Sequence, residues 1–311
     1  MIQTIRDAEE PVILVDCGGF YPLKYPVTLR GVIVETTLTA MNIMDYTAVN
    51  IGTGELSLGP RFFSEKAENH PVPFVTSNIT FKGSAAPPAD KYILTKAGNL
   101  TVAILGVVPT EVQDKYPALH SSALIDIVPP GDALAAILPD IRKQADIVIL
   151  LSHLGNMETR RLLVKFPDID LAVYGGSAQN MADESSCGTP SNPKRASGEN
   201  EITIVSVEAA PKSPVLNVSG LGTHLGYAHF AVGKDGKVEL TEKKNIYLTE
   251  SMAKDERIKN ITGDDMKKMV SEYQKRQFDK KQRTIERLHK MTPMEYVEEV
   301  LEEQKEKGDN R

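Results

Sequence analysis

The sequence has few of the residues that mark several common protein classes. It contains no tryptophan and only two cysteines, and aromatic residues make up 6% of its 311 positions. Two cysteines with no Cys-x-x-Cys pair exclude a disulfide framework and a four-cysteine zinc module. No run of about 18 apolar residues occurs, so no membrane-spanning helix is expected. The first residues also lack the basic region and apolar run of a recognisable signal peptide.

An excess of positive charge is also missing. The 36 Lys and Arg residues are outnumbered by 42 Asp and Glu residues, which gives a formal net charge of −6. This balance argues against a nucleic-acid-binding protein. The hydrophobic fraction of 41% and the charged fraction of 25% are those of a globular chain, whose length suits two domains or one large α/β domain.

Charge is concentrated near the C-terminus. From Ser251 onward the chain holds 15 of the 36 basic and 14 of the 42 acidic residues. Apolar residues at helical spacing predict a helix over 264–291, and an acidic segment follows Pro293. We therefore divide the chain into a body, 1–248, and a charged helical tail, 249–311. The tail is either a solvated pair of helices, which we favour, or a docking arm for a partner or another subunit.

The body alternates between expected strands and helices. Short apolar runs predict strands at 11–16, 46–51, 72–76, 146–152 and 169–174, with a hairpin formed by 91–96 and 100–108. Helices are expected at 29–44, 54–69, 130–145 and 157–166, a polar loop at 180–200, and further strands at 201–207, 216–219, 227–232 and 237–248. This order predicts a layered α/β body rather than one doubly wound sheet.

Small and polar residues follow four of these strands. Ligands in open α/β folds bind beyond the carboxyl ends of the strands, so these tetrads are the candidate site. They are Asp16-Cys17-Gly18-Gly19, Gly52-Thr53-Gly54-Glu55, Ser152-His153-Leu154-Gly155 and Gly175-Gly176-Ser177-Ala178.

The order and spacing of the tetrads resemble the calcineurin-like metallophosphatase domain of bacterial 5′-nucleotidases and UDP-sugar hydrolases. In that family strands run into Asp-Ala-Gly-Asp, Gly-Asn-His-Glu, Ser-His-Leu-Gly and Gly-His-x-His. Here "ADIVILLSHLGN" and "FPDIDLAVYGGSAQ" match that layout closely. The resemblance covers about residues 5–245. It implies a β-sandwich flanked by helices and two divalent ions about 3.5–4 Å apart that activate water.

Most of the residues that would bind those ions are replaced. Gly19 stands where the family has the bridging Asp, Thr53 and Gly54 replace Asn and His, and Gly176 and Ala178 replace both His residues of the last motif. The family's Asp-x-His strand and its large C-terminal domain have no match either. Only His153 matches a ligand of the family. We therefore expect no binuclear site and at most one divalent metal ion, and we predict no other cofactor.

The resemblance and the losses together predict a degenerate domain that binds a ligand or partner and does not cleave phosphoesters. The residues expected at the mouth of the old site are Asp16, Gly18, Gly19, Thr53, Gly54, Glu55, Gly176 and His224. For His153, Asp16 and Glu55 we favour structural roles: a hydrogen-bonded strand-end histidine, an acceptor of turn N–H groups, and a cap.

Two alternatives remain open. Cys17 at the old mouth, followed by two glycines, could have a lowered thiol pKa, and Cys187 in a polar loop could act as its resolving thiol. This would make the chain a thiol-dependent redox protein. Alternatively, Asp16, Glu55 and His153 could form a rearranged site with one metal ion that still hydrolyses phosphoesters.

The strand at 11–16 is expected to have an exposed sheet edge. Exposed edges favour pairing with another strand, so we expect a homodimer or a protein partner, through this edge or through the 249–311 tail. Nucleic acid is not an expected partner. The resemblance suggests a periplasmic or cell-envelope location, whereas the sequence taken literally suggests the cytoplasm.

Overall fold

A first, short-stranded parallel sheet begins the body of the protein in the computed structural model. Its order is β1 (Val15–Asp16), β2 (Ala48–Asn50), β3 (Phe74–Val75) and β5 (Ala89–Asp90). Helix α2 (Val27–Ile43) lies between β1 and β2, and α3 (Thr53–Ser57) and α4 (Pro60–Glu68) lie between β2 and β3. The short helix α1 (Ile2–Arg6) precedes β1. Among the described residues, β1 is an edge strand of this sheet, as expected.

The structure describes residues 2–8, 11–21, 27–82, 89–115, 125–175, 213–217, 224–233, 237–249, 251–252, 255–261, 263–292 and 294. The chain forms two compact units, Met1–Asp255 and Glu256–Arg311, and each is described by itself. The functional division at 248/249 stays a prediction.

A second, longer sheet carries most of the apolar residues. Its order is β11 (Val215–Asn217), β10 (Leu171–Tyr174), β9 (Ile147–Ser152), β7 (Leu100–Val107) and β6 (Tyr92–Ala97). The first four strands are parallel, and β6 pairs antiparallel with β7 in the expected hairpin. Helices α7 (Pro130–Ile141) and α8 (Asn156–Lys165) flank β9 in the chain.

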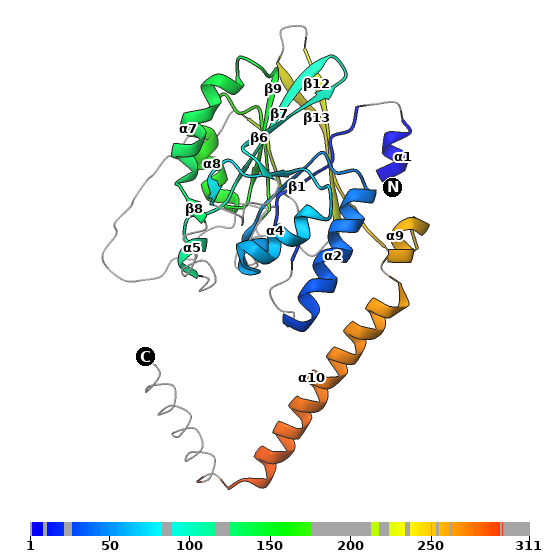
Figure 1. The fold of residues 1–311 in the computed structure, drawn as a ribbon. Helices are drawn as coiled ribbons and strands as arrows, with labels where there is room; N and C mark the ends of the chain where they lie inside the picture. Colours follow the sequence, from blue (N-terminus) through cyan, green and yellow to red (C-terminus); the bar gives the residue numbers. More distant parts are fainter. Residues whose placement is uncertain are drawn as a thin grey trace, which may run out of the picture. The chain divides into compact units, whose positions relative to one another are not determined.

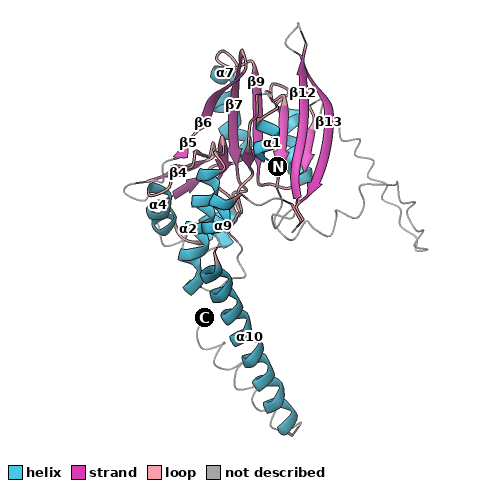
Figure 2. Ribbon diagram, turned by 90° about the vertical axis from the view of Figure 1, so that its right-hand side faces the viewer, coloured by secondary structure: helices cyan, strands magenta, loops and turns pink. Residues whose placement is uncertain are grey.

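Three smaller pieces complete this unit. They are the pair β4 (Ile79–Phe81) and β8 (Ile125–Ile127), the helix α5 (Val112–Lys115), and the hairpin β12 (His224–Val232) and β13 (Val238–Tyr247). Figures 1 and 2 show the long β12–β13 ribbon beside the sheets.

The five-stranded sheet has a buried core on each face. On one face Leu105 and Leu150 pack with Leu134 and Leu138 of α7 and Leu163 of α8. On the other face Ile104, Ile149 and Leu151 pack with Cys17, Ala48 and Val75 from the first sheet. Helices, sheet and sheet therefore form successive layers, with α2 and α4 near the first sheet (Figure 1). The predicted β-sandwich flanked by helices is confirmed.

The elements differ from the expected ones mainly in length. The helix expected at 54–69 is two helices, because Gly59 adopts a φ of 88° and Pro60 starts α4. Of the strand expected at 11–16, only Val15–Asp16 forms a β-strand. The expected strand at 201–207 and the loop at 180–200 lie outside the described residues.

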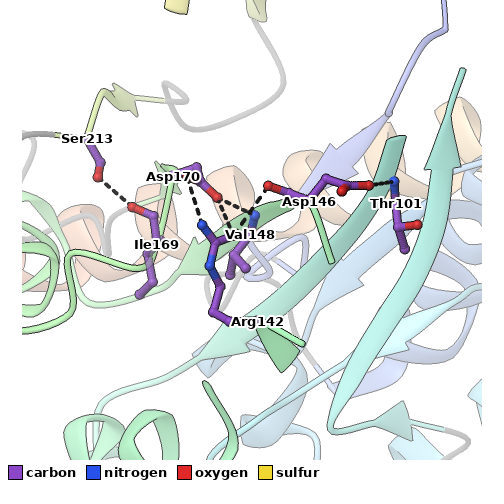
Figure 3. Close-up of polar contacts among 7 residues, drawn as sticks. All are labelled: Thr101, Arg142, Asp146, Val148, Ile169, Asp170 and Ser213. Carbon is purple, nitrogen blue, oxygen red and sulfur yellow. Dashed lines mark hydrogen bonds and ion pairs between the residues drawn. The ribbon is translucent and has the colours of Figure 1, made fainter. Parts of the chain in front are cut away.

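Polar contacts fasten the amino ends of three parallel strands (Figure 3). Asp170 accepts hydrogen bonds from Val148 N at 2.8 Å and from the Arg142 guanidinium at 2.9 Å. Asp146 accepts one from Thr101 N at 2.7 Å. These contacts join the end of α7 to the amino ends of β7, β9 and β10, whereas the candidate site lies at the carboxyl ends of the strands.

The second unit contains α9 (Glu256–Ile261) and the long helix α10 (Asp264–Lys290). The helix expected at 264–291 is confirmed almost to the residue, because its apolar residues recur at helical spacing without a Gly or Pro. The acidic segment after Pro293 lies outside the described residues, apart from Met294. Within the described part of the chain, no helix is long and apolar enough to span a bilayer.

Candidate functional site

Two glycines form the turn after β1 and allow it to pack closely against the end of β2. Gly18 and Gly19 have φ angles of 80° and 83°, a region that L side chains rarely adopt. A Cβ atom on Gly18 would lie 2.6 Å from Asn50 O and from Gly52 N. The ends of β1 and β2 therefore come together only because position 18 has no side chain.

Glu55 joins the two turns through its carboxylate. The side chain is fully buried, and it accepts hydrogen bonds from Gly19 N at 2.7 Å, Gly52 N at 2.8 Å and Tyr21 N at 3.1 Å. Burial raises the pKa of Glu55, and the three backbone donors oppose that rise. The expected capping role is present, because Gly52 is the N-cap of α3 and Glu55 is the third residue of that helix.

His153 follows β9 and has both ring nitrogens in hydrogen bonds within the protein. Nδ1 lies 3.2 Å from Cys17 O, and Nε2 lies 3.0 Å from Thr53 Oγ1. The residue is 5% exposed, and burial lowers the pKa of its imidazole, which favours the neutral ring. A Cβ on Gly19 would lie 2.6 Å from the ring atom Cε1, so the imidazole lies against the position where the family has its bridging Asp.

Asp16 ends β1 beside these groups. Its Oδ1 accepts a hydrogen bond from Gly18 N at 2.7 Å, which is the structural role favoured from the sequence. Loss of hydration raises the pKa of Asp16 to about 6, and the negative charge of Glu55 adds to that rise. The carboxyl groups of Asp16 and Glu55 therefore lie close enough to interact electrostatically.

Cys17 is buried, and its thiol donates to Val173 O at 3.2 Å. The alternative in which the glycine turn lowers its pKa is contradicted: burial and the neighbouring Asp16 charge raise the pKa of Cys17 well above its usual range. The packing contact with β10 explains this, because the sulfur points between the two sheets and not to the surface. Cys187 lies outside the described residues, so its pairing with Cys17 stays a prediction.

Asn50 is a site residue that the sequence reading missed. It is fully buried at the end of β2, and its Nδ2 donates to Val107 O at 3.0 Å and to Cys17 O and Leu151 O at 3.3 Å. Its Oδ1 has no hydrogen-bond partner among the described residues. The available signal was a single amide within the apolar run TAVNI. This side chain links the ends of three strands across the two sheets.

The remaining predicted residues are only partly brought together. Thr53 is half-buried and Gly54 is buried, and both lie next to the turn at Gly19. Gly176 lies outside the described residues. His224 begins β12 opposite Tyr247, which places it in a separate two-stranded sheet. The structure therefore assembles Asp16, Gly19, Thr53, Glu55 and His153 into one cluster.

This cluster does not fit a binuclear metal centre. The Glu55 oxygens accept backbone N–H groups, both His153 nitrogens have partners in the protein, and one oxygen of Asp16 accepts Gly18 N. Divalent ions require several oxygen or nitrogen ligands that converge on one point. Within the described residues, no group of three His, Cys, Asp or Glu side chains could hold an ion.

Sequence comparisons place the chain near nucleotidases. It is 25% identical to 5′-nucleotidase of Bos taurus over 271 residues and to the snake venom 5′-nucleotidase of Naja atra over 273 residues, each match covering 83% of this chain. It is 24% identical to a 2′,3′-cyclic-nucleotide 2′-phosphodiesterase/3′-nucleotidase of Yersinia enterocolitica over 78% of its length. These matches cover 44%, 48% and 40% of the relatives, so the chain spans less than half their length. No family model matches the chain.

Solved structures show the same fold. The calcineurin-like phosphoesterase YfkN of Bacillus subtilis aligns with a TM-score of 0.59 and 18% identity, over 84% of this chain and 85% of that one. The sulfate thiohydrolase SoxB of Thermus thermophilus aligns with a TM-score of 0.61 and 18% identity, over 88% of this chain and 46% of that one. Together the comparisons show a fold of the calcineurin-like metallophosphatase type and sequence similarity to 5′-nucleotidases over about 83% of the chain.

Proposed function

We propose that this 5′-nucleotidase-like metallophosphatase domain binds a ligand or partner protein and does not hydrolyse phosphoesters through a pair of metal ions. The observation that carries the proposal is that the polar side chains of the site form hydrogen bonds with the protein's own backbone and side chains. His153, Glu55 and Asp16 hold the turns of the protein together through hydrogen bonds. Fold and activity are therefore separable in this chain.

The backbone of the site supports the same proposal. A side chain at Gly19 would meet the His153 ring, and a Cβ on Gly54 would lie 2.5 Å from Tyr21 O. The positions where the family has Asp and His are thus closed to larger side chains in this arrangement. The carboxylates of Asp16 and Glu55 would also repel a dianionic phosphate at this site.

Partner binding is supported by the surfaces of α10 and β1. Every described side chain of α10 from Gln274 to Thr284 is exposed, and Phe278 is 62% exposed. β1 has a neighbour on only one side among the described residues. Light scattering tests the homodimer form of this proposal: a dimer that dissociates in Phe278→Asp supports it, and a monodisperse wild-type monomer contradicts it. The periplasmic or cell-envelope location remains part of the proposal and rests on the resemblance alone.

The test of lost catalysis is a hydrolysis assay with bis(p-nitrophenyl) phosphate and 5′-AMP, with Mn²⁺, Zn²⁺ or Mg²⁺ added. We expect no turnover above that of a protein-free reaction. His153→Ala is compared with His289→Ala, because His289 is an exposed histidine at the end of α10.

Each possible result of this assay has a defined meaning. Metal-dependent hydrolysis that His153→Ala abolishes and His289→Ala leaves intact would contradict the proposal and favour a rearranged metal site. Hydrolysis that both variants retain equally would point to a contaminating phosphatase, which repurification removes. No hydrolysis under any metal condition supports the proposal.

A further inference from the structure

The hydrogen bonds of His153 determine which of its ring nitrogens carries the proton. Nδ1 faces Cys17 O at 3.2 Å, and a carbonyl oxygen can only accept, so Nδ1 must be the N–H donor. In the neutral ring Nε2 then has a lone pair, and the Thr53 hydroxyl, 3.0 Å away, donates its proton to it. The imidazole is thus oriented by a backbone carbonyl and directed at a hydroxyl.

This arrangement has the parts of a nucleophile and its base. An activated nucleophile needs a hydroxyl within about 2.6–3.2 Å of a base, and the base needs a third group that orients it. Thr53 supplies the hydroxyl, His153 the base and the Cys17 carbonyl the orienting group. Thr53 is half-buried, whereas His153 is 5% exposed, so Thr53 is the more exposed residue of the pair.

We propose that Thr53 and His153 form a nucleophile–base pair that accepts acyl groups from small uncharged carboxylic esters. Thr53 Oγ1 attacks the ester carbonyl carbon and forms a C–O bond while its proton moves to His153 Nε2. The tetrahedral intermediate collapses, the bond to the leaving alcohol breaks, and the imidazolium returns the proton to that alcohol. Water, deprotonated by the same nitrogen, later cleaves the acyl-threonine and releases a carboxylic acid.

The charges around the pair favour this class of substrate. Asp16 interacts electrostatically with both His153 and Glu55, so the pair lies beside two carboxyl groups. Negative charge at this place repels phosphate esters but stabilises the imidazolium that forms during attack. An uncharged ester avoids the repulsion. This activity needs no metal ion, so it is independent of the metallophosphatase chemistry discussed above.

The test uses p-nitrophenyl acetate in the presence of EDTA, followed by peptide mapping by mass spectrometry. We expect one acetyl group on Thr53 after a brief exposure. The rate of Thr53 acetylation should fall about 10²-fold or more in His153→Gln, because general-base assistance contributes about that factor. Thr53→Ser should remain acetylated at this position.

Thr53→Val keeps the shape of the side chain and removes the hydroxyl. The part of the p-nitrophenol release that comes from acylation of Thr53 should therefore be lost in this variant. Thr39→Val is the matched control, because the Thr39 hydroxyl donates to a helix carbonyl, Glu35 O at 2.7 Å, and not to any histidine among the described residues. Release should be unchanged in that variant. Circular dichroism of each variant confirms that it is folded.

Two results would overturn the proposal. The first is wild-type protein without an acetyl group on Thr53, which requires no variant to interpret. The second is equal acetylation of Thr53 in the wild type and His153→Gln. Neither result affects the proposed loss of metal-dependent hydrolysis, because EDTA is present throughout and no phosphoester is used.

Discussion

Glu55 is the side chain whose removal should damage the site most. Its carboxylate accepts three backbone N–H groups, from Gly19, Tyr21 and Gly52, and it is fully buried. In Glu55→Ala these three donors lose their partner inside the protein. A buried donor left without a partner costs about 1–3 kcal/mol, which sets an upper range of about 3–9 kcal/mol.

The carboxylate is itself costly to bury, as its raised pKa shows, and its removal returns part of that cost. We therefore expect the free energy of unfolding to fall by about 3–5 kcal/mol in Glu55→Ala. Glu55→Gln keeps the volume and one acceptor but turns an amide N–H₂ toward a backbone N–H, so a smaller loss of about 1–3 kcal/mol is expected.

Urea unfolding at pH 7, followed by circular dichroism, measures these differences. Glu158→Ala is the control, because Glu158 forms an exposed ion pair with Arg161 that should contribute less than about 1 kcal/mol. If Glu55→Ala unfolds within about 0.5 kcal/mol of the wild type, the carboxylate does not hold the turns together, and the reasoning is refuted.

Three further predictions concern the same strand ends. Gly18→Ala should lower the free energy of unfolding by about 3 kcal/mol or more, measured in urea, because a Cβ would meet backbone at 2.6 Å. Gly98→Ala should cost only about 1 kcal/mol, because its Cβ would meet Pro11 Cγ at 3.7 Å, an ordinary contact distance. Equal effects would refute the packing argument. The pKa of Asp16 rises from 3.8 to about 6 on folding, so the folded protein binds this proton more tightly than the unfolded chain. As the pH rises from about 4 to 6, the free energy of unfolding of the wild type should therefore fall by up to about 3 kcal/mol relative to that of Asp16→Asn. A constant difference between the two proteins from pH 3.5 to 7 would contradict the shift. Cys17 should react with a thiol reagent only in unfolded protein, as peptide mapping would show, and rapid native labelling would contradict its burial.

The sequence was sufficient for the layered fold and for much of the site. Apolar runs such as DIVILLS locate β9 correctly, and the Gly residues after β1 and β2 indicate where the turns pack. The structural role of Glu55 also follows from its position three residues after Gly52, which is the spacing of a capping box.

Other features depend on contacts between distant segments and could not be read from local patterns. The low reactivity expected of Cys17 results from packing against Val173, which lies 156 residues away. The contact between Thr53 and His153 spans 100 residues, and Asn50 reaches a strand 101 residues distant. Short-range periodicity carries no information about such pairs, so the sequence left the alternative of a lowered Cys17 pKa open, and the structure contradicts it.

Metal stoichiometry tests the central claim most directly. The full chain is incubated with manganese, zinc and iron, desalted, and examined by element analysis, with His153→Ala treated in parallel. The account predicts no retained metal, because the polar atoms of His153, Glu55 and Asp16 bind the protein's own backbone and side chains. Two equivalents of metal per chain, lost in His153→Ala, would contradict it and return this domain to the binuclear phosphoesterases.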